Sequence, residues 1–169
     1  MRVTSFVACG FVVVLAGTAH AQTTKFSGKC VAQKADPAYT AEVGDRAAHV
    51  LMLAKQKCTW DKAEIAGLEL KDEEDTVTSD ITGNSSRDHG YGVGTTSSGD
   101  KYFVRFDGTS MLKNNVPTSL KCTWSFTGGT GKLKGLTGKG TCAGTMNPDG
   151  TGPVNVEGEY QIVAKSGTH

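Results

Sequence analysis

Two neighbouring segments carry the side chains best suited to contact a ligand. In residues 88–95, His89 and Tyr91 alternate with three glycines, so a strand here presents an imidazole and a phenol on one face and bare backbone on the other. A glycine face allows something bulky to lie against the backbone, either a ligand or a large side chain from elsewhere in the protein. The side chains considered for that second role are Trp60, Trp124 and Phe126.

The second segment, residues 101–107, alternates an apolar set (Tyr102, Val104 and Phe106) with a mixed set (Lys101, Phe103, Arg105 and Asp107). If the apolar set packs against a covering turn, the mixed set lines the interior. Arg105 paired with a carboxylate could there orient a ligand's acid or carbonyl group. The alternative is a solvated outer pair, because one sequence does not determine strand register. The candidate ligand contacts inside the fold are therefore His89, Tyr91, Gly92, Arg105 and Asp107.

Other groups with chemical potential give weaker signals. Residues 72–75 are four consecutive acids, which we interpret as a solvated hairpin tip, because a calcium loop needs spaced ligands and a glycine turn. Residues 128–132 superficially suggest a phosphate-binding loop, but Lys132 is followed by Leu133 and not by the Ser or Thr that such a loop needs. We find no Ser/His/Asp or Cys/His arrangement for nucleophilic catalysis, and no sign of a cofactor.

These segments belong to a chain of short strands. Threonine, valine and aromatic residues alternate in brief runs, 22 glycines are spread along the chain, and helical periodicity is hard to find. The predicted strands are residues 25–34, 49–60, 63–70, 76–83, 89–97, 101–112, 118–127, 139–146 and 154–164. Strands without crossover helices need antiparallel connections, and closure removes the exposed edges of such a sheet. The sequence therefore predicts an all-β fold, a closed antiparallel meander β-barrel of about eight strands, calycin-like.

Four cysteines follow the N-terminal leader described below, namely Cys30, Cys58, Cys122 and Cys142. An even number of cysteines in an exported protein favours two disulfides. We prefer Cys122 with Cys142 and Cys30 with Cys58, because each pair lies on sequential strands joined as a hairpin. The alternative joins Cys30 to Cys142 and Cys58 to Cys122. A metal site is not predicted, because no Cys-x-x-Cys pair occurs and the histidines are scattered.

The N-terminus has the features of an export signal. Arg2 precedes an apolar run too short to span a bilayer, and Ala19-His20-Ala21 forms an Ala-x-Ala cleavage site before Gln22. Cleavage of residues 1–21 would leave residues 22–169 as a single β-barrel domain, secreted or periplasmic, with no integral membrane segment. This mature chain has 17 basic and 17 acidic residues, since Arg2 is one of the 18 basic residues. Such balance gives no reason to expect a nucleic-acid partner, and the oligomeric state stays open.

The glycine-rich segment from Phe126 to Gly140 reads Phe-Thr-Gly-Gly-Thr-Gly-Lys-Leu-Lys-Gly-Leu-Thr-Gly-Lys-Gly. It resembles the Gly-Gly-Thr/Ser-Gly-x-Phe/Leu-x-Gly-x-x-Gly segment of the allene oxide cyclase and dirigent-like β-barrel superfamily. The rest of the chain is similar to exported bacterial members without assigned activity. The resemblance implies a compact turn between two barrel strands, with Leu133 and Leu136 packed against the barrel. The catalytic residues of these families have no matching motif in this chain.

These features suggest three functions. The leading hypothesis is an exported barrel that binds a small, largely apolar ligand in its lumen. The alternative that the resemblance implies is an isomerase or cyclase of the allene oxide cyclase-like type. The third is a disulfide-stabilised scaffold with a filled core whose loops bind another protein. A lumen of roughly a few hundred Å³ would favour the first two, and a buried acid or histidine with a perturbed pKa inside it would favour catalysis.

Overall fold

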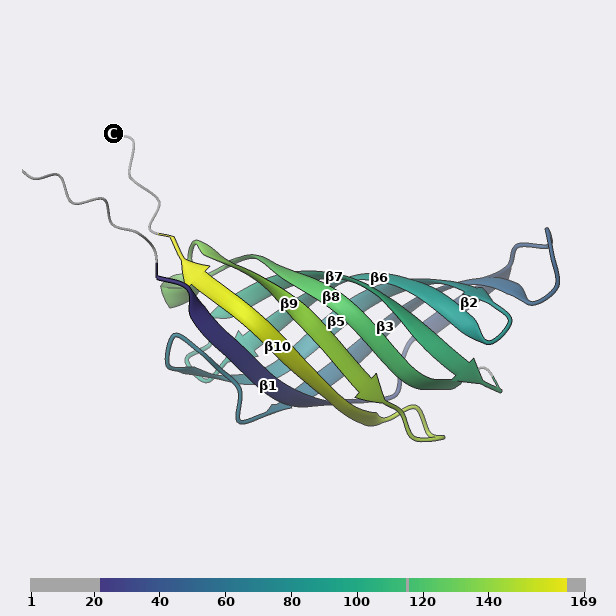
Figure 1. The fold of residues 1–169 in the computed structure, drawn as a ribbon, viewed down its shortest axis with the longest axis horizontal. Coiled ribbons are helices and arrows are strands. Elements are labelled where there is room, and N and C mark those ends of the chain that lie inside the picture. The colour runs from purple at the N-terminus through teal and green to yellow at the C-terminus, as the bar shows by residue number, and fades with distance from the viewer. Residues whose placement is uncertain (1–21, 115, 164–169) are drawn as a thin grey trace, which may run out of the picture.

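The computed structural model describes residues 22–114 and 116–163, which form ten strands and one short 3-10 turn (Figure 1). The strands are β1 (Thr24–Ala32), β2 (Ala38–Glu42), β3 (His49–Asp61), β4 (Glu64–Ile65), β5 (Leu68–Thr82), β6 (Ser85–Thr96), β7 (Lys101–Lys113), β8 (Val116–Gly129), β9 (Leu136–Thr145) and β10 (Gly152–Ile162). The turn η1 (Gly131–Leu133) lies between β8 and β9. The export signal expected over residues 1–21 lies outside the described residues. Within them, no helix has the length and apolarity needed to cross a membrane.

Eight of the strands close into an antiparallel ring, which confirms the predicted meander barrel (Figure 1). From β5 to β10 each strand pairs with the next, β10 pairs with β1, and β3 pairs with both β1 and β5. The other two strands are additions, since β2 pairs with the first half of β3 and β4 with the start of β5. The shortest pairing in the ring is β1 with β3, where Lys29–Ala32 lies against Cys58–Asp61.

Inward and outward side chains alternate along the strands, except where a bulge interrupts a strand. On β7 the inward set is the apolar one, and Tyr102 and Val104 are buried. Three of the inward positions of β6 are glycines, and two of these, Gly90 and Gly94, lie opposite Phe106 and Tyr102. The aromatic rings of Phe106 and Tyr102 occupy the space that a Cβ at those glycines would need. The bare face of β6 is therefore covered by side chains of the neighbouring strand, and not by the tryptophans or Phe126 considered from the sequence.

The four consecutive acids at residues 72–75 lie within β5, which corrects their interpretation as a hairpin tip. The tip of this hairpin is Ala66-Gly67, two residues with positive φ that join β4 to β5. Two of the acids face outward and bond to the neighbouring strand β3: Asp72 accepts a hydrogen bond from Thr59, and Glu74 pairs with Lys55. The predicted strand over residues 76–83 is the second half of the same continuous strand.

A β-bulge in β5 determines where the other two acids point. Leu70 pairs with Thr96 of β6, whereas Glu73 pairs with Gly94, so one extra residue is inserted between them. An inserted residue exchanges the inward and outward faces of a strand that otherwise alternates. Leu70 is accordingly buried before the bulge, and Glu73 and Asp75 face the interior after it.

An apolar plug lies at the end of the barrel at which β1 begins and β10 ends, where Figure 1 shows the green turn between β8 and β9. Its four members, Ala63, Ile65, Leu133 and Leu136, are completely buried. They pack with the inward aromatic residues of the ring in one continuous cluster. Leu133 lies in η1 and Leu136 begins β9, so the glycine-rich segment folds back over the barrel end. The expected packing of these two leucines against the barrel is thus confirmed.

Candidate functional site

The interior of the barrel contains a cavity of about 460 Å³. Inward-facing residues from all eight strands of the ring line it. It begins at the aromatic cluster beside the plug and reaches the loops at the opposite end, where Lys34, Pro117 and Asp149 border it. We call this opposite end the mouth. A concave space of this size lies within the range of sites that bind small molecules.

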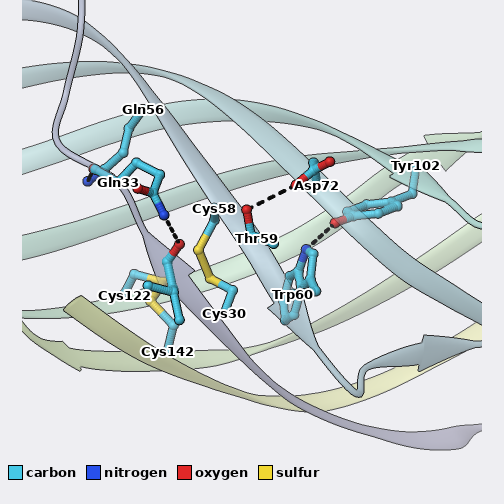
Figure 2. The surroundings of a disulfide bond; sticks show 11 residues. Cys30, Gln33, Gln56, Cys58, Thr59, Trp60, Asp72, Tyr102, Cys122 and Cys142 are labelled. Atoms are coloured by element: carbon cyan, nitrogen blue, oxygen red, sulfur yellow. Dashed lines mark hydrogen bonds between the residues drawn. A yellow bond between two sulfur atoms is a disulfide. The ribbon is translucent and has the colours of Figure 1, made fainter. Parts of the chain in front are cut away.

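Five aromatic side chains form the floor of the cavity next to the plug: Phe26, Trp60, Tyr102, Trp124 and Phe126. Phe26 packs edge-to-face against Trp60 and Trp124, with ring centroids 6.0 and 5.7 Å apart. Trp60 Nε1 donates a hydrogen bond of 2.7 Å to the hydroxyl of Tyr102 (Figure 2). Trp124 Nε1 donates a hydrogen bond of 3.1 Å to the backbone oxygen of Thr141. The floor is therefore a packed aromatic surface on which both indole N–H groups have an acceptor.

Two carboxyl groups reach this floor from β5. Glu73 and Asp75 both line the cavity, and both residues are half-buried. Both also lie against Gly92 of β6, where an added Cβ would collide with Asp75 Oδ1 and lie 3.1 Å from Glu73 Oε1. The absence of a side chain at Gly92 is therefore what allows the two carboxyl groups to lie side by side. We call Glu73 and Asp75 the acid pair.

Burial raises the pKa of both groups of the acid pair. For Asp75, desolvation is the largest cause, and the charge of Glu73 and the hydrogen bond with it move the pKa well above its usual range. For Glu73, desolvation again raises the pKa, and hydrogen bonding with Tyr102 and Asp75 opposes the rise. Burial and the Glu73 carboxylate also raise the pKa of Tyr102 well above its usual range, so this phenol stays protonated. The acid pair therefore keeps a proton to a higher pH than exposed carboxyl groups do.

No basic side chain balances the acid pair. None of the ion pairs among the described residues includes Glu73 or Asp75. Within the same part of the chain, Oδ1 of Asp75 is buried and has no hydrogen-bond partner when both carboxyl groups are ionised, because Glu73 is then an acceptor as well. An unsatisfied buried acceptor costs about 1–3 kcal/mol, so a donor that reached it would gain correspondingly.

Four more polar residues line the cavity on the same side as the acid pair, closer to the mouth: Ser79, Ser86, Asp88 and Ser110. Ser110 Oγ donates a hydrogen bond of 2.7 Å to Asp88 Oδ2. Together with the acid pair, these residues make the wall formed by β5, β6 and β7 polar and acidic. The facing wall is apolar and includes Ala32, Met146, Val154 and Val156.

Both disulfides lie in the cavity wall (Figure 2). Cys122 and Cys142 are direct partners on β8 and β9, with Cα atoms 4.9 Å apart. Cys30 and Cys58 join β1 to β3, with Cα atoms 5.6 Å apart, and so tie the shortest pairing of the ring. These are the two pairs preferred from the sequence. As disulfides they add apolar surface to the wall and supply no thiolate.

The structure places four of the five predicted ligand contacts on the outer surface. Tyr91 is 57% exposed, Arg105 is exposed, and Nδ1 of His89 lies 2.7 Å from Oδ1 of Asp107 in a solvent-exposed pair between β6 and β7. The prediction that these four side chains line the lumen is wrong, because the apolar set of β7 takes the inward face and leaves the mixed set outside. Gly92 faces the interior, where it lies against the acid pair.

Sequence reasoning missed the acid pair, Trp60 and Tyr102 as parts of a polar site. A usable signal for Tyr102 was present, because glycines alternate before the Ser98-Gly99 turn and large apolar residues alternate after it. A hairpin closed by that turn brings Gly94 opposite Tyr102, so the bare and aromatic positions share one face. Pairing the glycines of one strand with the large apolar residues of the other would have identified Tyr102, Val104 and Phe106 as the inward residues of β7. The acidic run contains no comparable signal, since its orientation depends on the bulge.

The sequence matches no protein-family model, and no curated protein is significantly similar to it. The site is therefore assigned from geometry. An interior cavity, a pair of carboxyl groups with raised pKa and a buried acceptor without a partner occur together in one place.

Proposed function

We propose that the protein binds a small, largely apolar molecule inside its barrel. The observation that carries this proposal is the cavity of about 460 Å³, with an aromatic floor, an apolar wall and one polar wall. Sites for small molecules typically combine a concave apolar surface with a few polar groups that orient the ligand. A filled core would instead have supported the scaffold hypothesis, in which only the loops bind a partner.

We propose further that binding takes place after export, in the periplasm or outside the cell. The two disulfides support this, because such bonds form and persist in oxidising compartments. Protein recovered from the cell envelope or the culture medium should begin at Gln22. N-terminal sequencing that found Met1 in a membrane fraction would contradict the proposal.

Uptake of N-phenyl-1-naphthylamine tests the binding function, because this neutral apolar dye becomes fluorescent when it leaves water. Val77 lines the cavity, whereas Val93 on the neighbouring strand is 44% exposed to solvent. Val77→Phe should fill part of the cavity and strongly reduce dye fluorescence, whereas the matched change Val93→Phe should leave it unaltered. Near-ultraviolet circular dichroism would confirm that both variants are folded. No uptake by the unmodified protein, or equal uptake by the Val77→Phe variant, would refute the proposal.

A second function, proton-transfer catalysis of the isomerase or cyclase type, is favoured by the acid pair. Two carboxyl groups that share a proton can donate to one atom of a bound substrate and accept from another. The raised pKa of each group and the protonated phenol of Tyr102 beside them support this use.

Hydrogen exchange at carbon tests the catalytic alternative. In deuterated water, an ionised carboxyl group of the acid pair should remove a proton next to the carbonyl of 4-phenylbutan-2-one, and solvent deuterium should replace it. Proton NMR would follow the loss of that signal with the unmodified protein, the Glu73→Gln variant and, as an outward-facing control, the Glu74→Gln variant. Exchange at the rate of buffer alone would refute catalysis of this type without affecting the binding function.

A further inference from the structure

The charged side chains of the cavity floor and polar wall are all acidic. Glu73 and Asp75 lie at the floor, and Asp88 lies further along the same wall. The two basic residues that border the cavity, Lys34 and Lys121, are exposed to solvent. Among the described residues, the interior therefore has acceptors for positive charge and no internal cation to occupy them.

The acid pair is also incomplete as a hydrogen-bonded group. Asp75 Oδ1 is buried without a partner among the described residues, although Asp88 of the same wall is satisfied by Ser110. Buried polar groups in proteins are almost always bonded, and an exception calls for an explanation such as a missing ligand atom. A donor with several hydrogens could serve Asp75 and Glu73 at once.

The surroundings of the acid pair suit a cationic donor. Trp60 and Tyr102 lie at the same floor, and they are the ring types that attract cations most strongly. Carboxylates beside aromatic rings provide both a charge-assisted hydrogen bond and a face for cation–π contact. Once the acid pair is ionised, it would repel a carboxylate ligand at this position, and a neutral apolar ligand would offer Asp75 Oδ1 no hydrogen bond.

We propose that the natural ligand is an organic amine with an apolar body. Its ammonium group binds between Glu73 and Asp75 on the aromatic floor, and its apolar part extends along the disulfide-lined wall towards the mouth. The inference depends on the proposed binding function and specifies the chemical class of the ligand. It requires that the acid pair ionises when the amine binds, so that a proton leaves the pair as the ammonium group arrives.

Amine affinity should therefore fall on acidification. The groups facing the acid pair are Gln56 and Cys58 on β3, Gly92 and Gly94 on β6, and Tyr102 on β7. Of these only the phenol of Tyr102 titrates, since Cys58 is in a disulfide, and the raised pKa of Tyr102 keeps it neutral. Protonation of the acid pair is thus the event that would weaken amine binding, and a neutral ligand of the same shape should not respond.

Three probes with one carbon skeleton and different charge test the inference: 4-phenylbutylamine, 4-phenylbutan-1-ol and 4-phenylbutyrate. The protein has only two tryptophans, and both Trp60 and Trp124 lie in the cavity floor, so intrinsic fluorescence reports on this site. At pH 8 the amine should bind at least about tenfold more tightly than the alcohol, as expected when a hydrogen bond gains a charged partner. The carboxylate should bind most weakly, and the preference for the amine should shrink towards pH 5.

Two double variants distinguish an effect of the acid pair from an effect of the protein's other acidic residues. Glu73→Gln/Asp75→Asn removes both inward charges, whereas Asp72→Asn/Glu74→Gln removes the two outward charges of the same strand segment. The first should bind the amine and the alcohol with equal affinity, and the second should keep the full preference for the amine. Retained affinity for the alcohol would show that the first variant is folded with its cavity intact.

The outcomes distinguish this inference from the binding function. Equal binding of the amine and the alcohol by the unmodified protein, or tighter binding of the carboxylate, would overturn the amine assignment and leave the cavity as an apolar binding site. An amine preference that survives Glu73→Gln/Asp75→Asn would overturn the role of the acid pair. If none of the three probes binds, the proposed binding function fails and the inference fails with it.

Discussion

Replacing the acid pair by Glu73→Gln/Asp75→Asn should stabilise the ligand-free protein near neutral pH. Both carboxyl groups have raised pKa values in the folded state, so the folded protein holds protons that the unfolded chain has already lost. Stability falls with increasing pH wherever the folded state binds more protons. The penalty is therefore absent below the ordinary carboxyl pKa of about 4, grows as the pH rises towards the raised pKa values, and then stays constant.

The size of the effect follows from the number of protons retained. Each proton held by the folded state and lost by the unfolded chain lowers the free energy of unfolding by about 1.4 kcal/mol for every pH unit in this window. In a domain of this size, 1 kcal/mol corresponds to about 3–4 °C in the thermal midpoint. The midpoint of the unmodified protein should thus decline by about 5 °C per pH unit relative to the Glu73→Gln/Asp75→Asn variant for one retained proton.

Thermal unfolding between pH 4.5 and pH 8, followed by circular dichroism with the disulfides intact, measures this difference. The matched control is Asp72→Asn/Glu74→Gln. Lys55 lowers the pKa of Glu74, so that carboxylate contributes stability once it is ionised and the control should be no more stable than the unmodified protein. Parallel midpoints for the unmodified protein and the inward double variant, or a less stable inward variant at pH 8, would refute the reasoning about the acid pair.

Three further variants test other parts of the structure. Gly92→Ala places a Cβ against Asp75 Oδ1 and 2.7 Å from Val104 Cγ1, so it should lower the free energy of unfolding by about 1–3 kcal/mol. A urea titration measures this change, and unchanged stability would contradict the close packing at Gly92. Cys30→Ser/Cys58→Ser opens a loop of 28 residues and should lower the free energy of unfolding by about 3–4 kcal/mol, according to the chain-entropy relation. Intact mass measured before and after reduction should first show two disulfides in the unmodified protein, and free thiols in the folded protein would contradict the pairing. Leu133→Ala empties a completely buried position of the plug and should cost about 2–5 kcal/mol, whereas a loss below about 1 kcal/mol would show that η1 does not close the barrel.

The ring of strands could be predicted because it depends on local alternation of residues and on the composition of the whole chain. Short alternating runs indicate strands, and a sheet with many strands and no covering helices avoids exposed edges by closing. Cys122 and Cys142 could be paired correctly because they lie on consecutive strands of one hairpin, at directly opposed positions. Leu133 and Leu136 could be expected to pack against the barrel because the glycine-rich segment that contains them resembles a turn of the allene oxide cyclase and dirigent-like superfamily.

The polar site could not be predicted because it depends on register between strands. A strand shows its two faces in the pattern of residues, but only its pairing partners decide which face is inside. For β7 the sequence-based prediction placed Arg105 and Asp107 in the lumen, whereas in the structure both side chains are exposed on the outer face. For β5 the face changes within the strand, at the bulge before Glu73. After such a bulge the residues alternate between the two faces as before, so the sequence does not indicate that the inward and outward faces have been exchanged.

The short pairing between β1 and β3 has a consequence for the order in which the barrel assembles. β1 is the first strand of the barrel, but its nine-residue pairing is with β10, the last strand, across 136 positions between Thr24 and Tyr160. Pairings of such long sequence separation form late because of the loop entropy that they must overcome. Until β10 arrives, β1 has only four residue pairs with β3 to hold it. The bond between Cys30 and Cys58 can join these two strands before β10 has paired, so oxidation would keep β1 beside β3 while the rest of the barrel forms.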